Sequence, residues 1–195
     1  MLTIGITGGI GSGKSTVCKV VETLAVPVFY ADNEAKQLYF TDDEVAIAVK
    51  KLFGHAVDEH GRVMMNALAA EVFRNKEKLA ALNQIVHPAV KRAFEKWKDQ
   101  QKGKPYVIHE AAIMIETGSY KDCDHLILVS APMELRIERA MKLYKLSREE
   151  VVARINRQWS DEEKRKHCDI ELVNDGSELL LPQIIALHEN FSRGV

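Results

Sequence analysis

Residues 1–16 read MLTIGITGGIGSGKST, a short apolar run that passes directly into a glycine-rich loop. From Gly8 to Ser15 the loop has the pattern G-x-x-x-x-G-K-[ST], in which backbone N–H groups surround a phosphate. Lys14 is suited to reach the β and γ phosphates, and the Ser15 hydroxyl to ligate Mg²⁺. A helix expected over 14–24 adds its positive N-terminal dipole to the same anion site. The alternative is an ordinary glycine-rich turn, but the strand before the loop and the helix after it favour a nucleoside triphosphate site.

The loop defines the residues that we expect to contact the nucleotide. They are Gly9, Ile10, Gly11, Ser12, Gly13, Lys14, Ser15 and Thr16. The sequence lacks the N-K-x-D motif with which GTPases recognise their base, so ATP is the expected nucleotide.

The composition of the whole chain excludes several classes of protein. With 195 residues and a net charge of −1, the chain has the length of one domain and no basic field for nucleic acid or anionic membrane. Its three cysteines are widely separated, which fits a reducing compartment. No apolar run approaches the roughly 20 residues of a membrane span, and the N-terminal run lacks a basic flank. These features predict a cytoplasmic protein, a monomer or small homo-oligomer, that binds neither nucleic acid nor membrane.

Five short apolar runs predict a parallel sheet covered on both faces, because their apolar character is nearly continuous. They lie at 1–6, 26–31, 106–111, 125–130 and 169–173. The helical segments between them predict an α/β, three-layer fold of the phosphate-loop NTPase type. We expect one domain over 1–195, with a core of 1–35, 104–136 and 167–195, a helical insertion at 36–103 and a second, smaller one at 137–166.

Several local signals predict where helices begin. Asp42 or Asp43 is suited to cap a helix over 42–53, and Pro88 to start a new helix, because its missing N–H is harmless at the first helical position. Ser147 and Ser160, each followed three residues later by glutamate, form capping boxes.

Two carboxylates follow predicted strands and are candidates for chemistry. Asp32 ends the second apolar run, at the strand edge where parallel α/β sheets bind ligands. It is suited to orient an acceptor hydroxyl and accept its proton, or simply to cap the next helix. Glu110 lies at the end of the third run, where it either serves the metal or substrate or forms a buried pair with His109 or Lys14.

The segment 136–166 is rich in charge, with ten basic and six acidic residues. Most such side chains belong to solvated helix faces, but a few arginines in a mobile flap would neutralise a transferring phosphate and exclude water. Arg139 and Arg154 are the candidates for this role. His87, before Pro88, is either a substrate contact or a packed structural group.

Beyond the phosphate loop, the chain resembles the dephospho-CoA kinase family over nearly its full length. The matching stretches are GITGGIGSGKSTV (5–17), Ala31-Asp32, LFGHAVDEHG (52–61), LAAEVF (68–73), LNQIVHPAV (82–90), IMIETG (113–118), the Arg139 helix, RINRQ (154–158) and VNDG (173–176). The H-P, E-T-G and R-x-x-x-Q segments at these spacings discriminate far better than the loop, which many unrelated proteins share.

The resemblance implies transfer of the ATP γ-phosphate, with Mg²⁺, to the ribose 3′-hydroxyl of dephospho-CoA, the last step of CoA synthesis. It favours Asp32 as the base near the acceptor hydroxyl, alongside Lys14, Arg139 and Arg154 in catalysis. It implies that the 36–103 insertion holds the pantetheine-bearing substrate with His87 nearby, and that 137–166 is the lid. Asn174 and the residues after it, up to Gly176, would lie by the adenine of ATP.

The chain departs from the family pattern at three places. Residues 110–116 read EAAIMIE where the family usually has D-x-P-L-L-F-E, so that Glu110 replaces an aspartate. Met65 stands where an arginine is common, and Leu143 where the lid usually repeats an arginine. These differences concern substrate and lid contacts.

Two hypotheses compete with this function. One is a kinase for a nucleoside monophosphate or small alcohol, and the other is a nucleotide-sensing ATPase switch.

Overall fold

The computed structural model describes residues 1–73 and 75–193. The chain forms two compact units, each described by itself below. The first, the α/β unit, comprises Met1–Tyr30 and Gln101–Val195, and the second, the helical unit, comprises Ala31–Gln100. The segment 137–166 belongs to the α/β unit.

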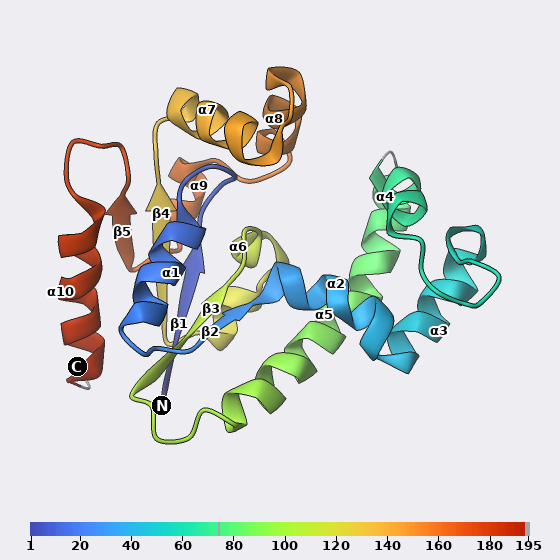
Figure 1. Cartoon of the computed structure of the whole chain (residues 1–195), viewed down its shortest axis with the longest axis horizontal. Coiled ribbons are helices and arrows are strands. Elements are labelled where there is room, and N and C mark those ends of the chain that lie inside the picture. Colours follow the sequence, from blue (N-terminus) through green and yellow to red (C-terminus); the bar gives the residue numbers. More distant parts are fainter. Residues whose placement is uncertain (74, 194–195) are drawn as a thin grey trace. The chain divides into compact units, whose positions relative to one another are not determined.

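The α/β unit is built on a five-stranded sheet with the order β2-β3-β1-β4-β5, in which all neighbours are parallel (Figure 1). The strands are β1 (Leu2–Thr7), β2 (Val28–Tyr30), β3 (Tyr106–Glu110), β4 (His125–Ser130) and β5 (Ile170–Val173). The predicted parallel sheet is confirmed, with β2 shorter than expected. Pro27 precedes β2 and contributes only its carbonyl, which accepts the Ile108 N–H, and Ala31 already begins the next helix.

The α/β unit contains the following helices besides its sheet. They are α1 (Lys14–Thr23), α6 (Met114–Thr117), the 3₁₀ turn η2 (Ser119–Asp122), α7 (Met133–Tyr144), α8 (Arg148–Ile155), α9 (Asp161–Arg165) and α10 (Leu180–Ser192). The helices α1 and α10 contact each other, whereas α6 contacts β1 and α9 contacts β4. Ser147 and Ser160 form the predicted capping boxes of α8 and α9.

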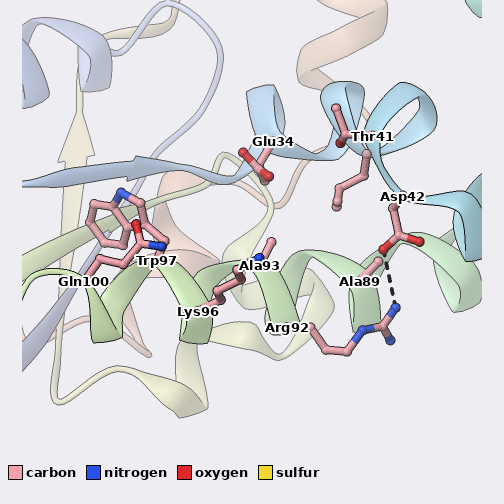
Figure 2. Close-up of a pocket in the computed structure, with 10 residues that line it drawn as sticks. Glu34, Thr41, Asp42, Ala89, Arg92, Ala93, Lys96, Trp97 and Gln100 are labelled. Atoms are coloured by element: carbon pink, nitrogen blue, oxygen red, sulfur yellow. Dashed lines mark ion pairs between the residues drawn. The ribbon is translucent and has the colours of Figure 1, made fainter.

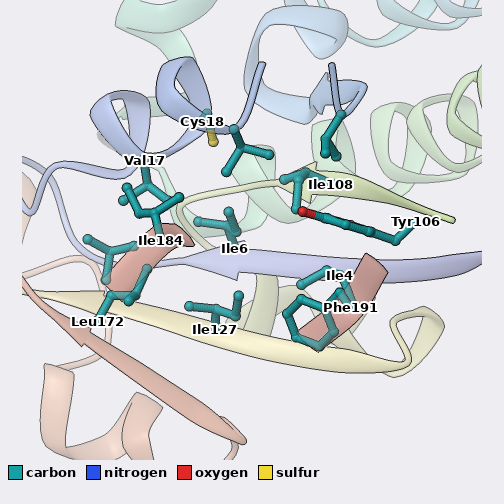
Figure 3. Packing of buried hydrophobic residues seen from close by; sticks show 13 residues of the cluster. Ile4, Ile6, Val17, Cys18, Tyr106, Ile108, Ile127, Leu172, Ile184 and Phe191 are labelled. Atoms are coloured by element: carbon teal, nitrogen blue, oxygen red, sulfur yellow. The ribbon is translucent and has the colours of Figure 1, made fainter. Parts of the chain in front are cut away.

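The core of the α/β unit lies between the sheet and the pair α1–α10 (Figure 3). Alternate residues of the strands, such as Ile4 and Ile6, point at this layer and meet Val17 from α1 and Ile184 from α10. All four side chains are buried. Burial of apolar surface at about 25 cal/mol per Å² drives this packing, and it fixes the start of α1 at the carboxyl-terminal edge of β1.

The helical unit contains α2 (Ala31–Thr41), α3 (Asp43–Leu52), the 3₁₀ turn η1 (Gly54–Ala56), α4 (Met65–Phe73) and α5 (Lys76–Asp99). Its core consists of apolar and aromatic side chains from all four helices, including Leu38, Val45, Val49, Leu68, Leu82 and Val86. Asp42 caps α3 as predicted, since its side chain accepts the N–H of Val45 at 3.1 Å.

The expectation that a helix begins at Pro88 is wrong, because α5 runs without interruption from Lys76 to Asp99. Its N-cap is Asn75, whose side chain accepts two backbone N–H groups. Proline removes one intrahelical hydrogen bond. The buried residues Val86 and Ala89 on either side of it share one face and hold the helix together across the missing bond.

Within the described residues, no helix is long and apolar enough to span a lipid bilayer.

Candidate active site

The phosphate loop joins β1 to α1 and has a backbone that only glycine adopts readily. Gly8, Gly11 and Gly13 have φ angles of +149°, +77° and +107°, which disfavour any residue with a Cβ. Space is also limited: a Cβ on Gly11 would overlap the backbone of Arg136, and one on Gly13 would overlap the side chain of Asn174. The glycines of the motif therefore permit both the fold of the loop and the close approach of side chains behind it.

Lys14, the first residue of α1, lies over the loop. Its Nζ donates to the Gly8 carbonyl at 2.9 Å and lies 3.9 Å from a carboxylate oxygen of Glu110. Ser15 and Thr16, next along the first turn of α1, are exposed. The loop thus presents an ammonium group, two hydroxyls and the positive end of α1 together, which is a site for a polyphosphate anion.

Glu110 ends β3, where it lies in register with Ile6 of β1 and Tyr30 of β2. It is 7% exposed, and its pairing with Lys14 matches one of the alternatives drawn from the sequence. His109 points to the opposite face of the sheet, as alternation along a strand requires. There it packs edge-on against Phe29, and burial lowers the pKa of His109 to about 4.

Asn174, just after β5, joins the phosphate loop to α7. Its Nδ2 donates to the Ser12 carbonyl at 2.8 Å. Its own carbonyl accepts Arg139 Nη1 at 2.9 Å, and its Oδ1 accepts Arg139 Nη2 at 3.4 Å. The structure therefore brings Asn174 and Arg139 together with the loop, although these residues are far apart in the sequence.

Arg136, one turn before Arg139 on α7, is a contact that the sequence did not single out. The side chain is buried, its Nε donates to the Ile10 carbonyl at 3.1 Å, and its Nη1 pairs with Asp161 at 3.1 Å. The Ile10 N–H is in turn accepted by Gln158 Oε1 at 2.9 Å. In the sequence Arg136 is one of ten basic residues in a charged segment, so only the structure distinguishes it.

Lys164 and Glu116 link the segment after α8 to the residues that follow β3. Lys164 is fully buried, donates to the Ala112 carbonyl at 2.7 Å and pairs with Glu116 at 3.1 Å. The same oxygen of Glu116 accepts the backbone N–H of Trp159 at 2.9 Å. Because Lys164 follows three acidic residues in an exposed-looking helix, nothing in the sequence predicted its burial.

The other predicted site residues are exposed. Arg154 lies on α8 of the α/β unit. Asp32 and His87 belong to the helical unit, on α2 and α5. Asp32 is the second residue of α2, so the alternative in which it caps a helix beginning near Asn33 does not hold.

The helical unit has a groove of its own, between α2 and α5 (Figure 2). Its volume is about 390 Å³, and it is lined by residues that recur at helical spacing on both helices. They include Leu38 and Asp42 on one side and Arg92, Lys96 and Trp97 on the other. An ion pair of 3.6 Å between Asp42 and Arg92 closes one end.

Comparison with known proteins gives a consistent result. The family model described as dephospho-CoA kinase matches residues 2–179. The dephospho-CoA kinase of Bacteroides fragilis is 38% identical over 186 residues, covering 95% of this chain and 91% of that protein. That of Chlorobaculum tepidum is 41% identical over 183 residues, covering 90% and 88%.

Solved structures share the fold over the whole chain. A crystal structure of a Thermus thermophilus protein has a TM-score of 0.87 and 38% identity, covering 100% of this chain and 98% of that one. The dephospho-CoA kinase of Campylobacter jejuni has a TM-score of 0.72 and 26% identity, covering 98% of both chains. With a phosphate loop, an all-parallel 2-3-1-4-5 sheet and relatives that align over nearly their full length, the chain belongs to the dephospho-CoA kinase family, the phosphotransferases that carry out the last step of coenzyme A biosynthesis.

Proposed function

We propose that this chain transfers the γ-phosphoryl group of ATP to the ribose 3′-hydroxyl of dephospho-CoA. The observation that carries the proposal is the phosphate loop, in a chain of this family. Lys14 lies over the loop, and side chains of α7 and of Asn174, just after β5, donate hydrogen bonds to its carbonyls. Such a loop fixes the donor. The choice of acceptor rests on the family and on the residues outside the loop.

On the donor side, residues 9–16 contact the triphosphate, and Lys14 stabilises the charge that develops as the γ-phosphoryl group leaves. Glu110, 3.9 Å from the Lys14 ammonium, holds that group at the end of β3. Arg139 and Arg154 supply further positive charge from 137–166, the segment that we propose as the lid. Arg139 already lies beside the loop through Asn174, whereas Arg154 is exposed and would act only from a closed lid.

The oxygen donors at the loop fit Mg²⁺, which prefers hard oxygen ligands. The Ser15 hydroxyl is exposed in the first turn of α1 and would hold the ion. Among the described residues no group of three or more His, Cys, Asp or Glu side chains is arranged to hold a metal, which fits an ion that takes its other ligands from phosphates and water. When bound, Mg²⁺ supplies neutralisation of the phosphate charge.

On the acceptor side, Asp32 orients the ribose 3′-hydroxyl and accepts its proton. The carboxylate is exposed and lies in the first turn of α2, where the helix dipole favours negative charge. We assign His87 to acceptor contact, since it is exposed on α5 of the same unit. Glu110 is the third acceptor candidate, at the end of β3.

The groove between α2 and α5 supports the role of the insertion 36–103 as the acceptor-binding part. Its volume of about 390 Å³ lies in the range of small-molecule sites. Its wall carries two bases, Lys96 and Arg92, together with two acids, Glu34 and Asp42, and Arg92 is paired with Asp42. Dephospho-CoA carries a diphosphate and a long flexible arm, for which a concave surface with cationic groups is suited.

A phosphoryl-transfer assay with a panel of acceptors tests the proposal. ATP and Mg²⁺ are supplied with dephospho-CoA, with a nucleoside monophosphate or with a simple alcohol, and both ADP and the phosphorylated product are measured. We expect one ADP for each 3′-phosphomonoester formed, only with dephospho-CoA. ADP release that does not depend on any acceptor, or a preference for the monophosphate, would overturn the assignment.

A further inference from the structure

Two side chains donate hydrogen bonds to carbonyl groups of the phosphate loop. Arg136 Nε donates to the carbonyl of Ile10 at 3.1 Å, and Asn174 Nδ2 donates to the carbonyl of Ser12 at 2.8 Å. Arg136 is 5% exposed, and its guanidinium occupies the space that Gly9 leaves by lacking a side chain. Each of the two donors therefore fixes the direction of one peptide carbonyl in the loop.

Fixing a carbonyl also fixes the N–H group of the next residue. The described peptide bonds are trans, and in a planar trans peptide the C=O and N–H vectors point in opposite directions. With the Ile10 carbonyl turned toward Arg136, the Gly11 N–H points away from Arg136. With the Ser12 carbonyl turned toward Asn174, the Gly13 N–H points away from Asn174.

The peptide between Gly9 and Ile10 is oriented in the reverse sense. Its N–H is accepted by Gln158 Oε1 at 2.9 Å, and its carbonyl, on Gly9, accepts Lys14 Nζ at 3.5 Å and the Ser12 N–H at 3.2 Å. The side of the loop that faces Arg136 and Gln158 is thus opposite to the side that holds Lys14. Lys14 marks the side on which we propose that the phosphates bind, and the Gly11 N–H points toward that side.

We propose that Arg136 and Asn174 are positioning residues that aim the Gly11 and Gly13 N–H groups at the triphosphate. The inference rests on the proposed use of the loop as a triphosphate site, and it gives Asn174 a role distinct from adenine contact. Arg136 is also held by Asp161 at 3.1 Å, and Asn174 by Arg139 at 2.9 Å. Each donor is therefore held by a second side chain as well as by its bond to the loop, and such support is what a positioning residue requires.

Inorganic tripolyphosphate is the probe that tests this inference, because it carries the phosphates without the base. We expect Asn174→Ala and Arg136→Gln each to weaken tripolyphosphate binding about tenfold, which corresponds to about 1.4 kcal/mol, and to weaken ATP binding by the same factor. Calorimetric titration of the whole chain measures both. An adenine contact by Asn174 would instead weaken ATP binding and leave tripolyphosphate binding unchanged, which would overturn the role of Asn174.

Control variants separate positioning from general stability. Asp161→Asn removes the charged partner of Arg136 but leaves the bond to Ile10, so it should weaken tripolyphosphate binding in the same direction as Arg136→Gln but by less. Arg148→Gln removes an exposed ion pair with Glu134 in the same segment and should leave binding unchanged. If Arg148→Gln weakens tripolyphosphate binding as much as Arg136→Gln does, loss of stability accounts for the effect and the inference fails.

The outcome remains decisive if one variant does not fold. Asn174 is only half-buried, so Asn174→Ala decides the case if Arg136→Gln is unfolded by circular dichroism. Unchanged tripolyphosphate affinity in a folded variant contradicts the inference. The titration involves no acceptor, so a failure of the proposed kinase reaction with dephospho-CoA would leave this result standing.

Discussion

The two units of the chain differ in how many polar residues they bury. Among the described residues, those polar or charged residues that are buried as whole residues belong to the α/β unit, including Glu110, Arg136 and Lys164. In the helical unit the side chain of Glu71 is buried and pairs with Lys78 and His55. The buried residues of the helical unit are apolar or aromatic, and its site candidates Asp32 and His87 are exposed. Charges that are buried must be paired to be tolerated, so the α/β unit carries a prearranged network around its loop.

The difference between the units agrees with our proposal that the α/β unit binds the donor and the helical unit binds the acceptor. A polyphosphate is a compact, highly charged ligand, and a loop braced from behind binds it with little reorganisation. In our proposal the acceptor, which is larger and more flexible, meets exposed side chains on helices whose core is mainly apolar. Substitutions in the α/β unit should therefore affect donor binding and stability, whereas substitutions in the helical unit should affect turnover.

The largest effect is expected at Lys14. Lys14→Met nearly keeps the length of the side chain but removes the charge that we propose acts on the γ-phosphate, so kcat/KM should fall about 10³-fold, as it does when other transition-state charge contacts are lost. Steady-state kinetics measures this change. Lys19→Met, at an exposed position of the same helix, is the matched control and should behave like the wild type. A loss below tenfold for Lys14→Met would mean that the loop does not act on the transferring group.

A loss of stability is expected at Lys164. Lys164→Met leaves Glu116 without its buried partner, which should lower the free energy of unfolding by about 3 kcal/mol. Urea denaturation measures it. The double variant Lys164→Met/Glu116→Gln removes both charges and should recover part of the loss. If Lys164→Met is as stable as the wild type, the buried pair contributes nothing to the α/β unit.

Asp32→Asn tests the helical unit. The amide cannot accept the proton of the acceptor hydroxyl, so kcat should fall about 10²-fold, while the KM for ATP stays near that of the wild type. Asp43→Asn, which also replaces an exposed aspartate in the first turn of a helix, is the control. A fall in kcat of only about twofold would leave Asp32 as a favourable charge at the start of α2 and no more.

The dependence of the free energy of unfolding on pH should reflect the protonation of the buried His109. Burial lowers its pKa to about 4, below the ordinary value of 6.5 for an exposed histidine, so the unfolded chain binds the extra proton. Its contribution to stability is therefore fully present above pH 6.5 and lost as the pH falls toward 4. We expect a loss of about 2 kcal/mol between pH 7 and pH 5. Urea denaturation of His109→Asn should show a shallower dependence, and an unchanged slope would argue against this assignment.

The sequence predicted the features that depend on local chemistry. The phosphate loop, the parallel sheet and the caps at Asp42, Ser147 and Ser160 follow from short patterns, because turns, caps and strand periodicity depend on neighbouring residues. The expectation that a helix begins at Pro88 is wrong, because a proline in the sequence does not reveal the buried residues on both sides of it that keep the helix continuous.

The contacts that brace the loop could not be predicted in the same way. Arg136 meets Ile10 across 126 positions of the chain, and Asn174 meets Ser12 across 162. Lys164 and Arg136 stand among many charges, most of which lie on solvated helix faces. A sequence pattern records the spacing along a helix, and only the fold decides which charge faces the core.

Hydrogen exchange measured with each ligand in turn is the most direct test of the proposal that the α/β unit binds the donor and the helical unit binds the acceptor. Peptide-resolved exchange is measured with ATP and Mg²⁺ alone, and then with dephospho-CoA alone. We predict that ATP slows exchange in the segment 8–16 and that dephospho-CoA slows exchange within Ala31–Gln100. Protection of the phosphate loop by dephospho-CoA, with no change in the helical unit, would contradict the account.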